Sequence, residues 1–361
     1  MRSLFFCSLL LLCVANTFSQ HAVSQKLDAL FSNVFNPAEP GGAVLIVKNG
    51  TVIYKNAFGV ADLNTKKKIT TQSLFNVGSI SKTFVAYGIL NLAKEGKLSL
   101  DDDIEKYFPG FKNPALAKQV KIYNLLTHTS GLPDNRHPYD DSIFYLTAND
   151  AQNWAPIMQN DTLEFAPGTH WNYSNPAFNG LALIIEKITG KKWQDYITAL
   201  IYKPSGMKHS TITDGAHPEN GVTHGYIIDG NGKWAERDYG EEPTFCAAGN
   251  GGIWSSVEEL WKYEQAIQRC TFLDSTWINK SRTVYPMPGW KDTTAPFMGL
   301  SWFIYGEGRD KFIGHTGSQG GFISDYVWLP GNQIFYVLLC NTPKPILDIR
   351  KEVLDLVEEH N

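Results

Sequence analysis

Strand-forming patterns occur near both ends of this 361-residue chain and helical patterns fill its middle, an arrangement that leaves few possible folds. Near the N-terminus, residues 43–47 and 52–58 are apolar or alternating runs joined by Asn49-Gly50, the strongest short signal for a β-hairpin. Beyond Pro243, four further runs have the composition of strands: 297–305, 311–314, 321–329 and 333–340. The two ends of the chain therefore supply the strands.

Helical patterns flank the predicted strands and separate the two sets. Residues 23–34 and 346–357 have apolar residues at the spacing of an amphipathic helix, and helical patterns predominate from Ser79 to about Tyr239. We expect an α/β fold of the α+β type: one antiparallel sheet, flanked by N- and C-terminal helices, with an inserted and mostly helical domain. The expected boundaries are a sheet subdomain of about 20–75 plus 243–361 and a helical subdomain of about 76–242.

The segment Ser79-Ile80-Ser81-Lys82 opens a long apolar stretch that runs to Lys94. A serine and a lysine three residues apart lie on the same side of a helix, so the amine can take the proton of the hydroxyl. Lysine acts as such a base only when its pKa is lowered, and burial among apolar neighbours lowers it. Ser79 at the N-terminal end of the helix also benefits from the helix dipole, which favours developing negative charge.

A second serine and lysine at the same spacing, Ser205 and Lys208, serve as an internal control. Pro204 and Gly206 flank that serine and predict a turn in place of a helix start. We interpret this second copy as structural.

Two short segments downstream indicate a function for the first copy, Ser79 and Lys82. Tyr173-Ser174-Asn175 stands in a loop before an apolar helical stretch, and His315-Thr316-Gly317 stands before a strand-like run that Ser318 opens. In this order the three segments resemble the penicillin-recognising serine hydrolases, a family of class C β-lactamases, penicillin-binding proteins such as D-alanyl-D-alanine carboxypeptidases, and related esterases. The resemblance covers about residue 25 to the end and implies a β-lactamase/transpeptidase-like fold, with residues 20–361 as one catalytic unit.

The resemblance also implies roles for individual residues. Ser79 would be the nucleophile, Lys82 its base and a hydrogen-bond partner of Tyr173, and Tyr173 the proton shuttle. Asn175 would orient Lys82 and the substrate; His315, Thr316 and Gly317 would line the strand along which the substrate lies. The oxyanion hole would be the backbone N–H groups of Ser79 and Ser318. The structural alternatives are a capping serine at Ser79, a core aromatic at Tyr173 and an Asx turn at Asn175.

One residue departs from the pattern of the β-lactamases. They usually carry lysine at the position of His315, and histidine there is more similar to the carboxypeptidase, aminopeptidase and esterase branches. An unperturbed imidazole is mostly neutral above about pH 6.5, so the site has one reliable cation fewer. An arginine from elsewhere in the chain, which the sequence does not identify, can replace that cation.

The N-terminus has the features of a signal peptide. Met1-Arg2 precedes an apolar run over 4–14, and small residues at Thr17 and Ser19 predict cleavage after residue 19. The run is too short for a transmembrane helix, and we expect none later in the chain. The protein should therefore be exported to the periplasm or the cell exterior. Leu12 before Cys13 argues against lipidation.

Charge and motifs narrow the function further. The net charge of −4 without a basic run argues against nucleic acid as a partner and favours a small-molecule or cell-wall peptide substrate. No phosphate loop, H-E-x-x-H or G-x-S-x-G motif occurs, so we expect no metal and no cofactor. We predict a serine hydrolase that forms an acyl-enzyme on amide or ester bonds of D-amino-acid peptides or esters. The alternatives are a class C β-lactamase and a penicillin- or peptidoglycan-binding sensor without turnover.

Overall fold

The structure is a computed structural model that describes residues 22–136, 148–212, 218, 220–237 and 248–358. The predicted signal peptide lies outside the described residues, as does Cys246. Cys270 and Cys340 are free thiols. Within the described ranges, no helix combines the length and the apolar character needed to cross a membrane.

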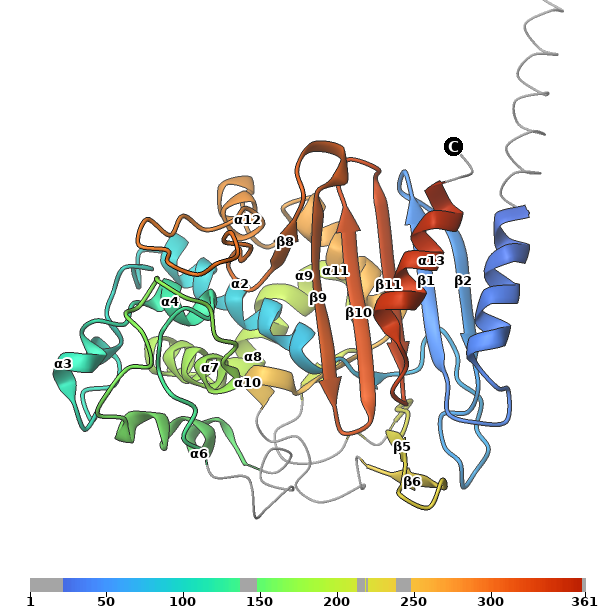
Figure 1. The fold of residues 1–361 in the computed structure, drawn as a ribbon, viewed down its shortest axis with the longest axis horizontal. Coiled ribbons are helices and arrows are strands. Elements are labelled where there is room, and N and C mark those ends of the chain that lie inside the picture. Colours follow the sequence, from blue (N-terminus) through green and yellow to red (C-terminus); the bar gives the residue numbers. More distant parts are fainter. Residues whose placement is uncertain (1–21, 137–147, 213–217, 219, 238–247, 359–361) are drawn as a thin grey trace, which may run out of the picture.

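A six-stranded antiparallel sheet, built from both ends of the chain, confirms the predicted architecture (Figure 1). The strand order is β2-β1-β11-β10-β9-β8. The bounds are β1 (Gly42–Lys48), β2 (Thr51–Phe58), β8 (Phe303–Tyr305), β9 (Phe312–Gln319), β10 (Phe322–Leu329) and β11 (Ile334–Cys340). The predicted hairpin joins β1 and β2, and Asn49 and Gly50 both have the positive φ that its turn requires.

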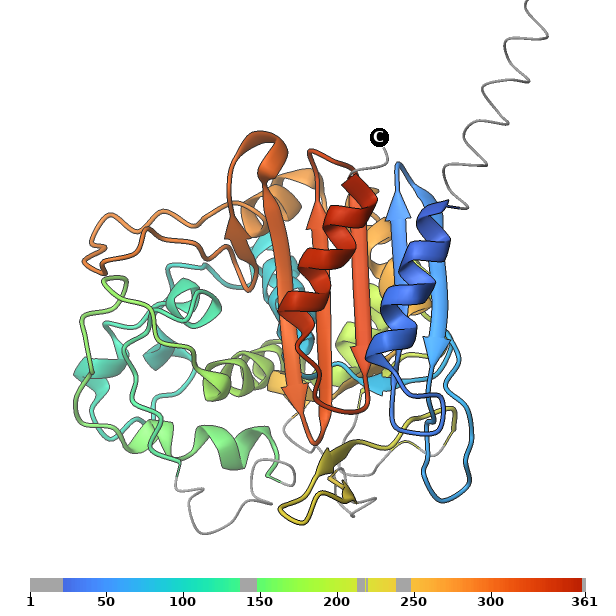
Figure 2. The same cartoon turned by 45° about the vertical axis from the view of Figure 1, so that its right-hand side comes forward.

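Two helices cover one face of the sheet, residues 22–34 and α13 (Ile346–Glu358), which lie side by side over the strands in Figure 2. Side chains alternate along β1: Val44 packs with these helices, whereas Leu45 packs into the larger core on the opposite face. That larger core includes α2 (Ser81–Lys94) and α11 (Val257–Gln268). The sheet is thus buried on both faces, and α2 lies behind it.

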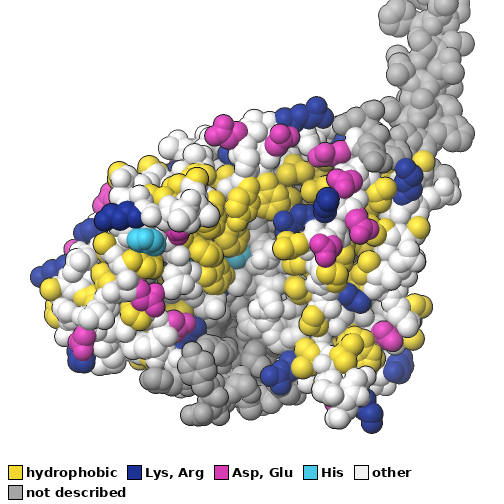
Figure 3. Space-filling view, viewed as in Figure 1, with side chains coloured by type: hydrophobic (Ala, Val, Ile, Leu, Met, Phe, Trp, Pro, Cys, Tyr) yellow, Lys and Arg dark blue, Asp and Glu magenta, His cyan; other side chains and the backbone are white. Residues whose placement is uncertain are grey.

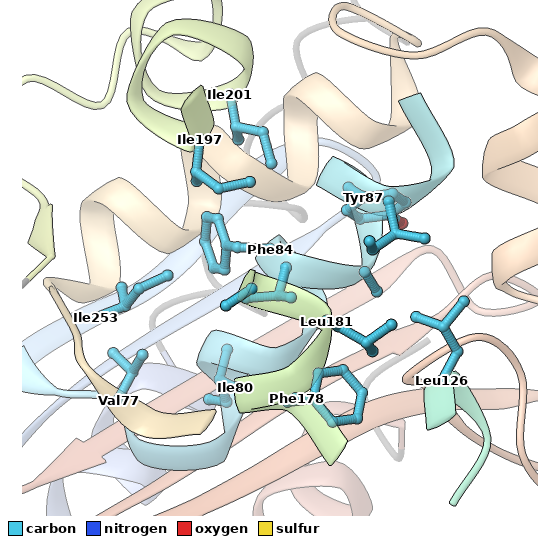
Figure 4. Packing of buried hydrophobic residues seen from close by; sticks show 14 of the residues in the cluster. Val77, Ile80, Phe84, Tyr87, Leu126, Phe178, Leu181, Ile197, Ile201 and Ile253 are labelled. Atoms are coloured by element: carbon cyan, nitrogen blue, oxygen red, sulfur yellow. The ribbon is translucent and has the colours of Figure 1, made fainter. Parts of the chain in front are cut away.

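Helix α2 is buried from Ser81 to Leu92 and forms the centre of the molecule. Phe84 and the preceding Ile80 lie close to Phe178 and Leu181 of α7 (Asn175–Thr189) in Figure 4. Helix α2 ends at Lys94 with Glu95 as its C-cap, and Gly96 follows in the left-handed conformation that commonly terminates helices.

Apart from α2 and α7, the described helices of the inserted region are short. They are η2 (Ile104–Lys106), α3 (Pro114–Ala117), α4 (Ile122–Leu126), α6 (Asp150–Trp154), η3 (Ile157–Gln159), α8 (Trp193–Ile197), η4 (Thr198–Tyr202) and α9 (Lys203–Ser205). Two small sheets accompany them, one of β3 (Phe75–Asn76), β7 (Ile253–Ser255) and β4 (Thr211–Ile212), the other of β5 (Tyr226–Ile228) and β6 (Trp234–Glu236). The division into two subdomains remains our proposal.

The C-terminal part of the chain contains helices as well as the predicted strands, and one of those strands is shortened. Before the first predicted strand, in a stretch for which the sequence analysis named no element, lie α10 (Ala248–Gly251), α11 and α12 (Ser275–Ser281). The predicted strand 297–305 is reduced to β8, because Ser301 has a left-handed backbone and the N–H of Gly299 donates to the carbonyl of Trp302. That tight turn interrupts a run of residues whose apolar composition alone resembles a strand.

Candidate active site

Ser79 lies in η1 (Gly78–Ile80), a single 3₁₀ turn that leads directly into α2. The sequence placed Ser79 in the first turn of the α-helix itself, and the structure places it just before that turn. Gly78 has φ 52°, and a Cβ built on it would lie 2.7 Å from the backbone nitrogen of Ser318. Only glycine permits this approach, so the 3₁₀ turn and β9 lie in direct contact at the serine.

Lys82 is fully buried, and its Nζ lies 2.9 Å from Oγ of Ser79. Its second hydrogen bond, at 2.6 Å, is donated to the carbonyl oxygen of Asn250 in α10. Burial lowers the pKa of Lys82 well below its usual range, and the positive charge of Arg136 lowers it further. A neutral amine beside a serine hydroxyl is the arrangement that general-base activation requires.

Tyr173 lies over the amine of Lys82, whose Nζ is 5.2 Å from the centre of the tyrosine ring. We expected a hydrogen bond between these two side chains; among the contacts of the described residues there is none. Burial raises the pKa of Tyr173, although a hydrogen bond with Ser79 opposes the shift. The phenol therefore stays protonated at neutral pH, in contrast to the lowered pKa that activation of water would need.

His128 supports Tyr173 from beneath, a contribution that the sequence analysis missed. The two rings stack with centres 4.2 Å apart, and Nδ1 of His128 accepts a hydrogen bond from the backbone N–H of Ser174 at 3.0 Å. Ser174 is the N-cap of α7, because its side chain accepts from the N–H of Ala177. His128 lies within the part of the chain that the family resemblance covers, but none of the three segments that carry the resemblance includes it.

His315 is a buried residue of β9. Its Nδ1 lies 2.6 Å from the carbonyl oxygen of Thr316; a carbonyl only accepts, so Nδ1 carries the proton and Nε2 is left as an acceptor. Nε2 has no hydrogen-bond partner within the described part of the chain. Burial, followed by the charge of Lys82, lowers the pKa of His315 to about 3. His315 is therefore a neutral acceptor and not a substitute cation.

All of the predicted site residues except the buried Lys82 line one pocket of about 890 Å³: Ser79, Tyr173, Asn175, His315, Thr316, Gly317 and Ser318. Figure 3 shows a hollow near the middle of this face, bordered by hydrophobic side chains. Gly317 lies so close to the chain before Ser79 that a Cβ on it would be 2.1 Å from the carbonyl oxygen of Val77. Asn175, the first residue of α7, lines the pocket but makes no hydrogen bond to Lys82 in the described contacts, and the carbonyl of Asn250 takes that place.

Two arginines that the sequence did not identify also line the pocket, Arg136 and Arg237. The guanidinium of Arg136 is buried, bonds both carboxylate oxygens of Asp134 and donates to Oδ1 of Asn153 at 2.5 Å. Neither arginine belongs to a sequence motif, and each reaches the pocket from a loop or hairpin. Ser205, the structural serine, ends α9 before a left-handed Gly206 and is not among the described residues of the pocket.

Comparisons with known proteins show which proteins this chain is similar to. Penicillin-binding protein 4* of Bacillus subtilis (strain 168) is 28% identical over 310 residues, which make up 82% of this chain and 67% of that protein. The octameric penicillin-binding protein homologue from Pyrococcus abyssi has a TM-score of 0.74 and 26% identity, covering 89% of this chain and 73% of that one.

The D-amino acid amidase from Ochrobactrum anthropi SV3 shares the fold, with a TM-score of 0.74 at 21% identity over 92% of this chain and 99% of that one. Residues 25–357 match the Beta-lactamase family, and that match covers nearly the whole described chain. The protein is therefore a member of the Beta-lactamase family.

Proposed function

We propose that this protein is a serine hydrolase that cleaves amide or ester bonds through an acyl-enzyme on Ser79. The observation that carries the proposal is the buried amine of Lys82, 2.9 Å from the serine oxygen and with a pKa well below that of a free lysine. We further propose D-amino-acid peptides, amides or esters as the substrate class. The fold shared with a D-amino acid amidase and the likeness to penicillin-binding proteins support that choice.

In the proposed reaction, Oγ of Ser79 attacks the substrate carbonyl carbon while Lys82 takes the hydroxyl proton. The oxygen of the tetrahedral intermediate then carries the negative charge, which the N–H groups of Ser79 and Ser318 stabilise. Tyr173, which remains a neutral phenol, relays a proton to the leaving group as the carbon–nitrogen or carbon–oxygen bond breaks. Water hydrolyses the acyl-enzyme in the second half, with Lys82 as the base, and Ser79 regains its proton.

A neutral His315 favours substrates without a carboxylate at that position. Its lone pair on Nε2 repels a carboxylate and accepts a hydrogen bond from an N–H or O–H group of a substrate. We therefore expect activated esters and D-amino-acid amides to be turned over better than β-lactams, whose carboxylate finds a lysine in most β-lactamases.

The test compares a p-nitrophenyl ester, a D-Ala-D-Ala peptide, a D-amino-acid amide and a chromogenic cephalosporin as substrates. Ser79→Ala should abolish turnover and covalent labelling, whereas Ser205→Ala, the matched control, should leave both intact. An adduct found by mass spectrometry on a peptide without Ser79 would overturn the assignment. Efficient cephalosporin turnover that His315→Lys leaves unchanged would refute the role given to His315.

The lifetime of a fluorescent penicillin adduct separates the remaining alternatives. Rapid loss of the label supports a hydrolase, and a persistent label supports a sensor that acylates without turnover. Export also belongs to the proposal, on the strength of the signal-peptide pattern over residues 1–19. N-terminal sequencing of protein recovered outside the cytoplasm tests it, with residue 20 as the expected first residue.

A further inference from the structure

Asp150, the first residue of α6, is a buried carboxyl group that the proposed reaction does not use. It is not among the described residues that line the pocket. Its Oδ1 accepts from Nδ2 of Asn179 at 2.6 Å and from the backbone N–H of Gly249 at 3.1 Å. Its Oδ2 accepts from Nε1 of Trp193 at 3.0 Å. One side chain thus joins α6 to α7, α8 and α10, all of which lie near one another in Figure 1.

A continuous series of hydrogen bonds leads from Asp150 to the proposed base. Oδ1 of Asn179 accepts from Nδ2 of Asn250 at 3.0 Å, and the carbonyl oxygen of Asn250 accepts from Nζ of Lys82 at 2.6 Å. Asp150 therefore holds α10 at two points, directly through Gly249 and through Asn179 at the Asn250 side chain. The carbonyl that follows directly after those two points along the chain is the one that meets the amine.

The backbone of α10 has little freedom to move within this contact. A Cβ built on Gly249 would lie 2.8 Å from Cβ of Ala182, 2.8 Å from Oδ1 of Asp150 and 2.8 Å from the carbonyl oxygen of Phe178. The tight approach lets Asp150 reach the backbone N–H directly. A shift of Asp150 is therefore transmitted to the Asn250 carbonyl.

We propose that Asp150 is a positioning residue, which fixes the Asn250 carbonyl so that the amine of Lys82 stays directed at Ser79. The inference rests on the proposed function, because it gives Lys82 the role of base. It adds a cause for the geometry: the motif places lysine three residues after serine, but a long, flexible side chain needs a second acceptor to hold its amine on the serine.

The chemistry of the carboxyl group explains why asparagine cannot replace it. A carboxylate has acceptors only and meets three donors here, whereas an amide turns one oxygen into a donor that faces another donor. Burial raises the pKa of Asp150 to about 7, with a smaller contribution from the charge of Glu186, although the three hydrogen bonds oppose the shift. Asp150→Asn thus preserves the shape of the side chain and disrupts its hold on α10.

The experiment compares Asp150→Asn with Trp193→Phe. Trp193→Phe removes only the hydrogen bond to Oδ2 of Asp150 and leaves both hydrogen bonds of Oδ1. It therefore shows what disturbing this buried cluster costs while Asp150 still holds α10. Both variants are assayed at a temperature where circular dichroism shows them folded. Asp150→Asn should lower kcat by about 10- to 100-fold with little change in KM, since displacement of a reacting group by less than 1 Å has effects of this size. Trp193→Phe should lower Tm and keep kcat within about twofold of the wild type.

A second readout needs no substrate. In protein labelled with ¹³C-lysine, the Cε resonance of Lys82, identified by its loss in Lys82→Ala, is followed against pH. Loss of a carbonyl acceptor disfavours the ammonium form, so the titration of Lys82 should move to lower pH in Asp150→Asn and stay in place in Trp193→Phe. Asn250→Ala, which cuts the path at Asn179 without touching Asp150, should move it in the same direction.

The two readouts separate the inference from the proposed function. A wild type that turns over and labels nothing, with a titration that moves in Asp150→Asn, contradicts the hydrolase and retains the positioning role. An active wild type with an unmoved titration and an unchanged kcat in Asp150→Asn overturns the positioning role. Equal effects of Asp150→Asn and Trp193→Phe on kcat overturn it too, because they indicate general damage to the fold. If Asp150→Asn does not fold, Asn250→Ala decides by the same two readouts.

Discussion

Gly78→Ala is the substitution for which the structure gives the sharpest expectation. The added Cβ would lie 2.7 Å from the backbone nitrogen of Ser318 and 3.1 Å from the carbonyl carbon of Gly317. Ordinary van der Waals contacts of a Cβ begin at 3.4 Å. The strand must therefore move away by a few tenths of an ångström, and at most by the difference between 2.7 Å and 3.4 Å. The atoms in the way are backbone atoms of β9, which cannot rotate aside as the end of a side chain can.

The displacement acts on one of the two proposed oxyanion donors. Loss of one such donor costs about 10²–10³-fold in kcat in related acyl chemistry, and a displacement of about 1 Å costs about 10²-fold. A shift of several tenths of an ångström should therefore lower kcat by about 30-fold or more, mostly without a change in KM. The left-handed backbone, with φ 52°, adds a stability cost of about 1–2 kcal/mol for alanine.

Gly96→Ala is the matched control, because Gly96 follows the other end of the same helix. It also has a left-handed backbone, with φ 68°, but nothing lies within 4 Å of its added Cβ. It should lose about 1 kcal/mol of stability and none of the activity. Steady-state kinetics on the p-nitrophenyl ester and urea unfolding of both variants give the comparison. A folded Gly78→Ala protein with the kcat of Gly96→Ala would refute the oxyanion hole formed by Ser79 and Ser318.

Three further predictions concern buried charge. Arg136→Met removes a positive charge that lowers the pKa of Lys82, so the acidic limb of the kcat/KM profile should move to higher pH; a limb that stays in place contradicts this. His315, with a pKa of about 3, contributes stability that is present above pH 6.5 and lost as the pH falls toward 3. Between pH 6.5 and 4.5 the wild type should lose about 2 kcal/mol more than His315→Gln in urea unfolding, and equal losses would be the contrary result. Glu264→Gln leaves Arg282 buried without its bidentate partner and should cost about 3–5 kcal/mol, read as a fall in Tm.

The parts of the site that the sequence predicted are those set by local geometry. Ser79 and Lys82 share one helix side because of their spacing, and the 2.9 Å contact follows once the helix forms and is buried. The hairpin at Asn49-Gly50 is local in the same sense, since two residues with positive φ define its turn. The sheet followed from the position of the alternating runs at both ends of the chain.

The parts that the sequence did not predict depend on segments far apart in the chain. The acceptor for Lys82 is a backbone carbonyl at position 250, and every residue has a carbonyl, so residue type carries no signal for it. Asp150 and Asn179 are ordinary polar residues until the fold buries them against α10. Arg136 reaches the pocket from a loop whose path no local pattern encodes.

Burial determines which side chains of the site carry a charge, and the residue types alone do not predict this. Lysine and histidine side chains are positively charged when protonated. Burial lowers the pKa of Lys82, His128 and His315, and the charge of Lys82 also lowers the pKa values of both histidines. Burial therefore disfavours positive charge on all three side chains. In the proposed reaction Lys82 takes a proton from Ser79, and the oxyanion that forms beside Lys82 compensates its charge only for the life of the intermediate. Once the oxyanion collapses, the ammonium is again unfavourable, so the proton passes to the leaving group through Tyr173, a phenol that burial keeps protonated and ready to donate.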